Sequence, residues 1–313
     1  MQHLYAIGGL RVASDVALPH ARPVAPGADA EASAPGDDLV EIRRVETLDR
    51  PAGALHDGVR FAADPRDVWF SVDEGLALRV RQGRRIDVFC PDEGRQEDVV
   101  LYLMGSAWGV LCHQRRRLPL HCSAVADGEH AIALCAESGE GKSTLAAALA
   151  AAGFAHVCDD VALLDPEGDS LRFTPVDKGL KLHREVAERL ALTGTGRVSA
   201  LPDFDKIYAR PASSGARDHY RLRAVVSLRR SRADALVLRP LSGAEAFSTL
   251  DDNVYRREWI SVLRDGPEVF AQIGECLRRT DVYAFERPRD IGRLEEGAEH
   301  LADALLRVGL QGD

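Results

Sequence analysis

The alternation of hydrophobic and polar positions changes character near residue 95. Before that point, short runs of alternating residues predict strands, at Leu39–Val45, Val68–Val72, Ala77–Arg81 and Arg85–Cys90. The segment Ala21–Asp38 is rich in Ala, Pro, Gly and Asp, a composition that predicts a mobile loop. Residues 1–95 are therefore expected to form a small β-rich domain.

From residue 96 onward, helical and strand patterns alternate. Apolar residues three and four apart predict an amphipathic helix over Gln96–His113. Further strands are predicted at Leu118–Ala126, His130–Cys135, Phe154–Cys158, Ala224–Leu228, Leu236–Leu241 and Asp281–Glu286. Further helices are predicted at Ser143–Ala152, Val254–Arg264, Glu268–Arg279 and Arg293–Val308. This pattern favours an α/β fold, with residues 96–313 as the second domain.

Composition and charge narrow the class of protein. The 313 residues are 45% hydrophobic and 28% charged, which are ordinary globular values. A net charge of −9 argues against binding to nucleic acid or to an anionic membrane. The chain has no apolar run of roughly 18 residues, no signal-peptide pattern and no CxxC pair among its six cysteines. We therefore expect a cytoplasmic protein with reduced cysteines.

The strongest motif is the nine-residue run AESGEGKST, residues 136–144. It follows an apolar strand and opens a helix, as a phosphate-binding P-loop does, although Ala136 replaces the usual first glycine. Backbone N–H groups and the helix N-terminus favour an anion there. Lys142 is expected to reach the β- and γ-phosphates, and the Ser143 hydroxyl to hold Mg²⁺. The nucleotide-binding residues predicted in the loop are Ser138, Gly139, Glu140, Gly141, Lys142, Ser143 and Thr144.

Three further groups of residues are candidates for the same chemistry. Asp159 and Asp160 follow the next apolar strand, where a P-loop enzyme holds its metal, so one carboxylate can bind Mg²⁺ and the other act as general base. His121 lies on the strand that pairs with the one feeding the loop. Lys206 and Arg210 lie in Gly194–Gly215, whose small and turn residues suit a mobile lid over the phosphates.

Residues 120–165, together with the His-Gln-Arg run at 113–115 and Leu180-Lys-Leu182, resemble HPr kinase/phosphorylase. The resemblance is closest to stand-alone serine kinases encoded beside lasso-peptide and other peptide-modification enzymes. It implies a P-loop core related to phosphoenolpyruvate carboxykinase, use of ATP and Mg²⁺, and transfer of the γ-phosphoryl group to a serine of a peptide or protein. It also implies Asp160 as the base, Asp159 as the metal partner, and His121 acting on the γ-phosphate or the acceptor.

One departure from that family concerns the reverse reaction. The bifunctional enzymes carry a segment with glutamate and arginine after the Asp-Asp pair, whereas this chain has Thr174-Pro-Val-Asp-Lys-Gly-Leu-Lys181. Phosphorylase activity is therefore not expected.

The sequence argues against two other functions and leaves two open. The run Leu241-Ser-Gly-Ala-Glu245 follows Asp159 by too many residues to be an ABC-transporter signature, and no NKxD element supports a GTPase. A small-molecule kinase and an ATP-binding switch without phosphoryl transfer stay open. Residues 1–95 either bind an extended acceptor peptide by strand addition or cover the helix Gln96–His113. The sequence leaves the acceptor and any homo-oligomer undetermined.

Overall fold

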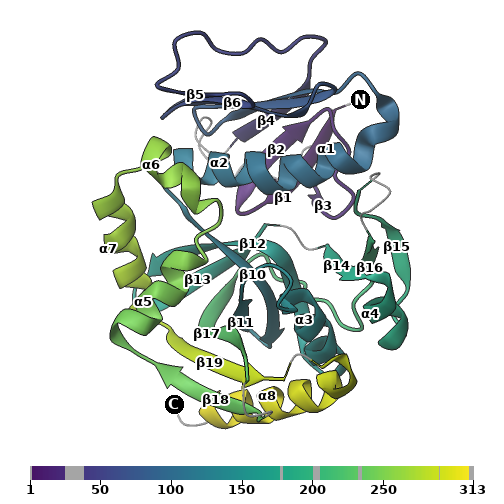
Figure 1. The fold of residues 1–313 in the computed structure, drawn as a ribbon, viewed down its shortest axis with the longest axis vertical. Helices are drawn as coiled ribbons and strands as arrows, with labels where there is room; N and C mark the ends of the chain where they lie inside the picture. The colour runs from purple at the N-terminus through teal and green to yellow at the C-terminus, as the bar shows by residue number, and fades with distance from the viewer. Residues whose placement is uncertain are drawn as a thin grey trace. The chain divides into compact units, whose positions relative to one another are not determined.

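The computed structural model describes residues 2–24, 39–176, 179–199, 205–231, 235–288 and 290–309 (Figure 1). Contacts between Cα atoms divide the chain into two compact units. The first contains residues 1–119, 197–204 and 255–270, and the second contains residues 120–196, 205–254 and 271–313. From residue 25 to residue 38, the predicted loop lies outside the described residues. The protein is of mixed α/β class, with three sheets among the described residues.

The first unit holds a nine-stranded sheet in the order β3-β1-β2-β4-β9-β8-β7-β6-β5. The β2–β4 and β4–β9 pairs are parallel, and the other pairs are antiparallel. The strands are β1 (His3–Ile7), β2 (Leu10–Ser14), β3 (Arg22–Pro23), β4 (Leu39–Arg44), β5 (His56–Gly58), β6 (Phe61–Asp64), β7 (Asp67–Asp73), β8 (Leu76–Arg81) and β9 (Arg85–Phe89). The four strands predicted between residues 39 and 90 are all present.

A helical run covers one face of this sheet. The predicted helix over Gln96–His113 is built as α1 (Gln96–Tyr102), a π-helical turn (Leu103–Ala107) and α2 (Trp108–Gln114), preceded by a 3-10 turn (Glu93–Arg95). The π-turn and α2 both contact β8, and Leu103, Val110 and Leu111 are fully buried. This packing places the helix in the same compact unit as the sheet, so the boundary at residue 119 falls after the predicted one near residue 95.

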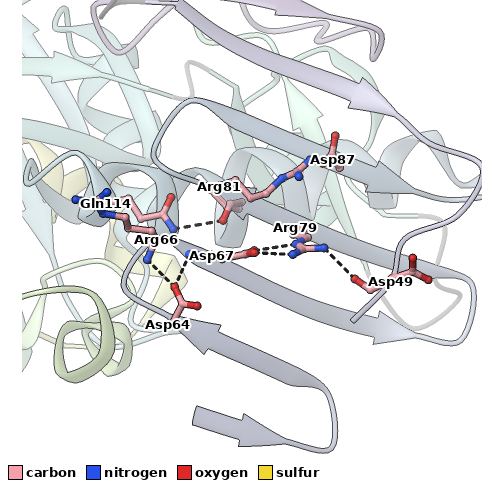
Figure 2. A network of polar contacts seen from close by, with 9 residues as sticks. Asp49, Asp64, Arg66, Asp67, Arg79, Arg81, Asp87 and Gln114 are labelled. Atoms are coloured by element: carbon pink, nitrogen blue, oxygen red, sulfur yellow. Dashed lines mark hydrogen bonds and ion pairs between the residues drawn. The ribbon is translucent and has the colours of Figure 1, made fainter. Parts of the chain in front are cut away.

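The opposite face of the sheet carries paired charges (Figure 2). Arg79 on β8 donates two hydrogen bonds to Asp67 on β7, at 2.8 and 2.5 Å. Asp87 on β9, whose side chain is 3% exposed, accepts from both Arg81 and Arg85. Because each buried or half-buried carboxylate has a guanidinium partner, this face tolerates charge within the sheet. The first unit also contains a 3-10 turn (Arg257–Trp259) and α6 (Ile260–Leu263).

The second unit is built on a seven-stranded sheet in the order β11-β10-β12-β13-β17-β19-β18, with an added β11–β17 pairing. Its strands are β10 (Leu118–Asp127), β11 (His130–Cys135), β12 (Ala155–Glu167), β13 (Ser170–Pro175), β17 (Tyr220–Arg230), β18 (Val237–Leu241) and β19 (Asp281–Arg287). A three-stranded sheet in the order β14-β16-β15 contains β14 (Leu180–His183), β15 (Gly194–Arg197) and β16 (Lys206–Ala209). The segment Gly194–Gly215, predicted as a flexible excursion, therefore contains two paired strands.

The helices of the second unit include two that the sequence pattern missed. They are α3 (Lys142–Ala151), α4 (Arg184–Arg189), α5 (Gly243–Asp252) and α8 (Leu294–Gly309), the last preceded by a 3-10 turn (Ile291–Arg293). The α7 helix (Gly266–Leu277) spans the boundary at residue 270. The sequence pattern predicted no helix at α4 or α5. It predicted one helix over Val254–Arg264, where the structure has a β-bridge at Val254, the 3-10 turn Arg257–Trp259 and the four-residue α6. The consecutive strands predicted at Ala224–Leu228 and Leu236–Leu241 are not neighbours in the sheet, because β19 lies between β17 and β18.

The core of the second unit gathers around α3. Leu145 and Leu149 pack with residues of β11, β17 and β19 and with α8. All six cysteines are buried and free of disulfides, as expected of reduced thiols. Among the described residues, no helix is long and apolar enough to cross a membrane. The core therefore holds β11, which leads into the phosphate loop, rigidly against the helix that follows it.

Candidate functional site

The predicted phosphate loop connects β11 to α3, as its sequence requires. Gly139 and Gly141 have φ angles of 84° and 87°, in the left-handed region that favours glycine. A Cβ atom at Gly141 would lie 2.7 Å from the Nη2 atom of Arg287. The loop therefore needs glycine at this position for its backbone conformation, whereas the Arg287 guanidinium is the end of a flexible side chain that can move aside.

Lys142 begins α3 and folds back over the loop. Its Nζ donates to the backbone oxygen of Ala136 at 2.8 Å, and the residue is 9% exposed. Burial lowers the pKa of Lys142, and the nearby Asp159 carboxylate is among the groups that oppose this shift. The ammonium group is thus held inside the loop by a single carbonyl, in a place where an anion would stabilise its charge.

Asp159 connects the loop to the neighbouring strands. Its Oδ1 accepts from the Ser143 hydroxyl at 2.8 Å and also from the Ser123 hydroxyl on β10. Its Oδ2 accepts from the backbone N–H of Lys181 at 3.1 Å, and the residue is 4% exposed. The structure thus brings together Ser143 and Asp159, the two residues predicted to hold the metal.

The donor set at this point suits magnesium. A hydroxyl and a carboxylate are hard oxygen ligands, and Mg²⁺ is commonly held by one or two such protein groups together with substrate phosphates and water. Ser143 and Asp159 supply these two oxygens side by side. Among the described residues, no group of three or more His, Cys, Asp and Glu side chains is arranged to hold a metal without such a substrate.

Asp160 lies within β12, not after the end of a strand as predicted, and its φ angle of 90° is unusual for a residue other than glycine. Although Asp159 and Asp160 are adjacent, their side chains have different partners. The Oδ1 of Asp160 lies 3.2 Å from His121 Nδ1, and its Oδ2 lies 3.2 Å from Lys181 Nζ. His121 Nδ1 also lies 3.1 Å from the backbone oxygen of Asp160. The strand histidine and the second aspartate thus meet directly.

The charge state of Asp160 follows from these contacts. Burial alone would raise its pKa, but the Lys181 ammonium and the His121 imidazole hold the pKa well below its usual range. Asp160 is therefore ionised at neutral pH and can accept a hydrogen bond from a hydroxyl group.

Lys181 is a site residue that sequence analysis missed. It lies on β14 between Leu180 and Leu182, and all three residues are buried. The signal available in the sequence was a lysine within an apolar strand, in a chain that has only four lysines. Its partner Asp160 is 21 residues away, at a separation that no helix or hairpin periodicity links.

Three arginines that sequence analysis also missed lie at the other end of the loop. Arg229 and Arg230 end β17, and Arg287 ends the adjacent β19. The Nη2 of Arg287 donates to the backbone oxygen of Glu140 at 2.7 Å. These three arginines and Glu140 line a narrow crevice together with Leu228 and Pro288. Guanidinium groups at this place suit the non-reacting phosphates of a nucleotide.

A large cavity of about 1070 Å³ opens beside the loop. It is lined by Ala136, Glu137, Ser138 and Glu140 of the loop, and by residues at the end of β17, on α5, at Asn253 and at His121. Among the described residues, those lining it do not include Lys206 or Arg210. Lys206 begins β16 opposite His183, and Arg210 donates its backbone N–H to Thr193, so the structure does not bring the predicted lid cations to the loop.

Comparisons with known proteins add little to this geometry. No protein-family model matches the chain, and no curated protein matches it. Among solved structures, the chain is similar to the Hpr(Ser) kinase/phosphatase from Coxiella burnetii, with 14% sequence identity and a TM-score of 0.32. The match covers 62% of this chain and 99% of that chain. A likeness this remote does not identify site residues, so the functional argument rests on the contacts described above.

Proposed function

We propose that the chain is an ATP-dependent phosphotransferase that transfers the γ-phosphoryl group of ATP to a serine hydroxyl of a peptide or protein. The observation that carries this proposal is the contact of Ser143 with Asp159, one residue from an ionised Asp160, beside a glycine loop. A phosphate loop alone would suit any nucleotide-binding protein. A second carboxylate paired with a histidine gives this site a group for the acceptor hydroxyl.

Each residue has a defined task in this reaction. The loop N–H groups and Lys142 bind the β- and γ-phosphates. The three arginines at the ends of β17 and β19 bind the non-reacting phosphates of the nucleotide. Mg²⁺, when bound by Ser143 and Asp159, would neutralise charge on the phosphates. Asp160 orients the acceptor hydroxyl and takes its proton as the new O–P bond forms and the bond to ADP breaks. His121 holds the Asp160 carboxylate in place.

The low proton affinity of Asp160 is compatible with this task. In a loose phosphoryl-transfer transition state, little negative charge is drawn from the attacking oxygen, so the hydroxyl proton leaves late. A carboxylate that stays ionised is then useful mainly because it positions the hydroxyl. The Lys181 ammonium keeps it ionised.

The test is ADP formation with and without a pool of serine-containing peptides, in the parent protein and in Lys142→Ala. We expect peptide-dependent ADP formation and phosphoserine in the parent, and a loss of about 10²- to 10³-fold in Lys142→Ala, because one charge-stabilising group is removed. Arg307→Ala, which removes an exposed cation from α8, is the control and should match the parent.

The alternatives predict different results. A small-molecule kinase would respond to hydroxylated metabolites and ignore peptides. A nucleotide switch would hydrolyse ATP slowly and form no phosphorylated product. Activity of Lys142→Ala within a few-fold of the parent would contradict the assignment of the loop. A lasso-peptide precursor as acceptor and peptide recognition by residues 1–95 stay predictions.

A further inference from the structure

The large cavity beside the phosphate loop is lined both by loop residues and by residues of α5. Pockets that enclose one small ligand typically measure about 300–1000 Å³, and this one measures about 1070 Å³. One wall is the loop, where the phosphates are proposed to bind. Another part of the lining comes from α5 and the residue that follows it, namely Ala244, Glu245, Ser248, Thr249, Asp252 and Asn253.

The end of α5 is fixed beside the reacting groups. His121 donates its backbone N–H to the Asn253 oxygen at 2.7 Å, and Leu120 and Val254 form a β-bridge. The Asn253 side chain donates to the backbone oxygen of Thr249 at 2.8 Å. Asp252, the last residue of α5, therefore lines the cavity at the end where His121 contacts Asp160.

The α5 wall is unsuited to phosphate. Glu245, at the far end, is neutralised by Arg239 at 3.0 Å and Arg229 at 3.6 Å. Asp252 is exposed and forms no ion pair with any residue that the structure describes. The C-terminal end of a helix also carries partial negative charge, which adds to the Asp252 carboxylate. The end of the cavity next to His121 thus favours a cation on its α5 side.

We propose that Asp252 selects an acceptor peptide with a lysine or arginine within a few residues of the phosphorylated serine. This inference rests on the proposed function and names its substrate class. The nucleotide occupies the loop side, the acceptor lies along α5, and its serine reaches Asp160 while its basic side chain pairs with Asp252. Repulsion between Asp252 and the incoming phosphates is removed by the same cation.

The test is a degenerate peptide library with a fixed central serine and varied flanking positions, phosphorylated with ATP labelled in the γ-phosphate. The parent protein should enrich lysine and arginine at one or more flanking positions. Asp252→Lys should lose this preference and enrich aspartate and glutamate instead. Asp303→Lys, the same charge change at an exposed position of α8, should keep the preference of the parent.

Kinetics with two defined peptides separate selection from a general defect. For the parent, replacing the basic residue of the best peptide by alanine should raise KM about five-fold, the effect of a partly exposed ion pair. For Asp252→Asn, the two peptides should have KM values within about two-fold of each other. A basic preference that is absent in the parent, or that persists in Asp252→Lys, overturns the inference.

The remaining outcomes separate this inference from the proposed function. If ATP turnover depends on Lys142 but no peptide is labelled, the acceptor is not a serine peptide, and the role of Asp252 is wrong while the nucleotide site stands. If ATP turnover does not depend on Lys142, the proposed function itself fails.

Discussion

Replacing Lys181 by methionine removes a buried positive charge while keeping the length of the side chain. The lysine side chain is 10% exposed, and its Nζ lies 3.2 Å from the Oδ2 of Asp160, whose side chain is 24% exposed. After the substitution, the Asp160 carboxylate keeps His121 as a partner but loses its ammonium. The variant therefore tests how much the ion pair between Lys181 and Asp160 stabilises the folded protein.

The size of the effect follows from the geometry. At 3.2 Å and an effective dielectric constant of about 20, two unit charges attract by about 5 kcal/mol. Methionine recovers part of this energy, because burying an ammonium group is itself unfavourable. Removing one partner of a buried pair typically costs about 3–5 kcal/mol, and the remaining contact with His121 favours the lower end. We expect Lys181→Met to lower the free energy of unfolding by about 3 kcal/mol.

The assay is urea denaturation followed by far-ultraviolet circular dichroism. All three tryptophans lie in the first unit, so tryptophan fluorescence does not report on the unit that contains Lys181. Parent, Lys181→Met, Asp160→Asn and the double variant form a mutant cycle, and Lys206→Met is the matched control. Lys206 forms no ion pair with the described residues, and its replacement should change the free energy of unfolding by less than about 0.5 kcal/mol.

The double variant decides the outcome. If the charges stabilise each other, Asp160→Asn combined with Lys181→Met should cost less than the sum of the single variants by about 2 kcal/mol. Additivity within about 0.5 kcal/mol, or a Lys181→Met cost no larger than that of Lys206→Met, would refute the reasoning.

Two further predictions concern the site and the first unit. Asp159→Asn should lose activity, and a higher Mg²⁺ concentration or added Mn²⁺ should partly restore it, because the substitution weakens a metal ligand. The activity lost in Asp160→Asn should not be restored by metal. Identical responses of the two variants would contradict the proposed division of roles. Buried His113 donates from Nε2 to the Tyr255 oxygen at 2.8 Å, and burial lowers its pKa to about 4. The folded state thus binds fewer protons than the unfolded state between pH 6.5 and 4, so the stabilisation is complete above pH 6.5 and about 3 kcal/mol is lost as the pH falls to 4. His113→Gln should show a smaller loss over this range in urea titrations, and an equal loss would show that other groups cause it.

The parts of the site that could be predicted from the sequence are those encoded by consecutive residues. Local backbone preferences determine the glycine positions, the place of Lys142 and the order of strand, loop and helix, and the residue types indicate these preferences directly. The pairing of β10 with β11 was equally local, since a two-residue turn with Gly128 at a φ angle of 58° joins them.

Other elements could not be predicted from the sequence, because tertiary contacts override the local hydrophobic pattern. The segment predicted as a helix from Val254 begins with a residue that forms a β-bridge to Leu120. The first unit joins three chain segments, so no composition shift along the sequence marks its boundary. The positive φ angle of Asp160 is also invisible in a hydrophobic pattern, and such conformations persist only where surrounding contacts hold them.

The same division runs through the proposed function. Binding a phosphate requires adjacent N–H groups and one cation, so nine consecutive residues suffice to predict the phosphate site. Directing the phosphoryl group to one hydroxyl requires groups that approach from several sides. In the proposed reaction these are His121 on β10, Asp160 on β12, Lys181 on β14 and Asp252 on α5, which are distant in the sequence. Asp160 contacts His121 and Lys181, and Asp252 lines the same cavity as His121. Acceptor choice is therefore the property that variants of Asp252 should change, while variants of Asp160 and of the loop should lower transfer to every acceptor alike.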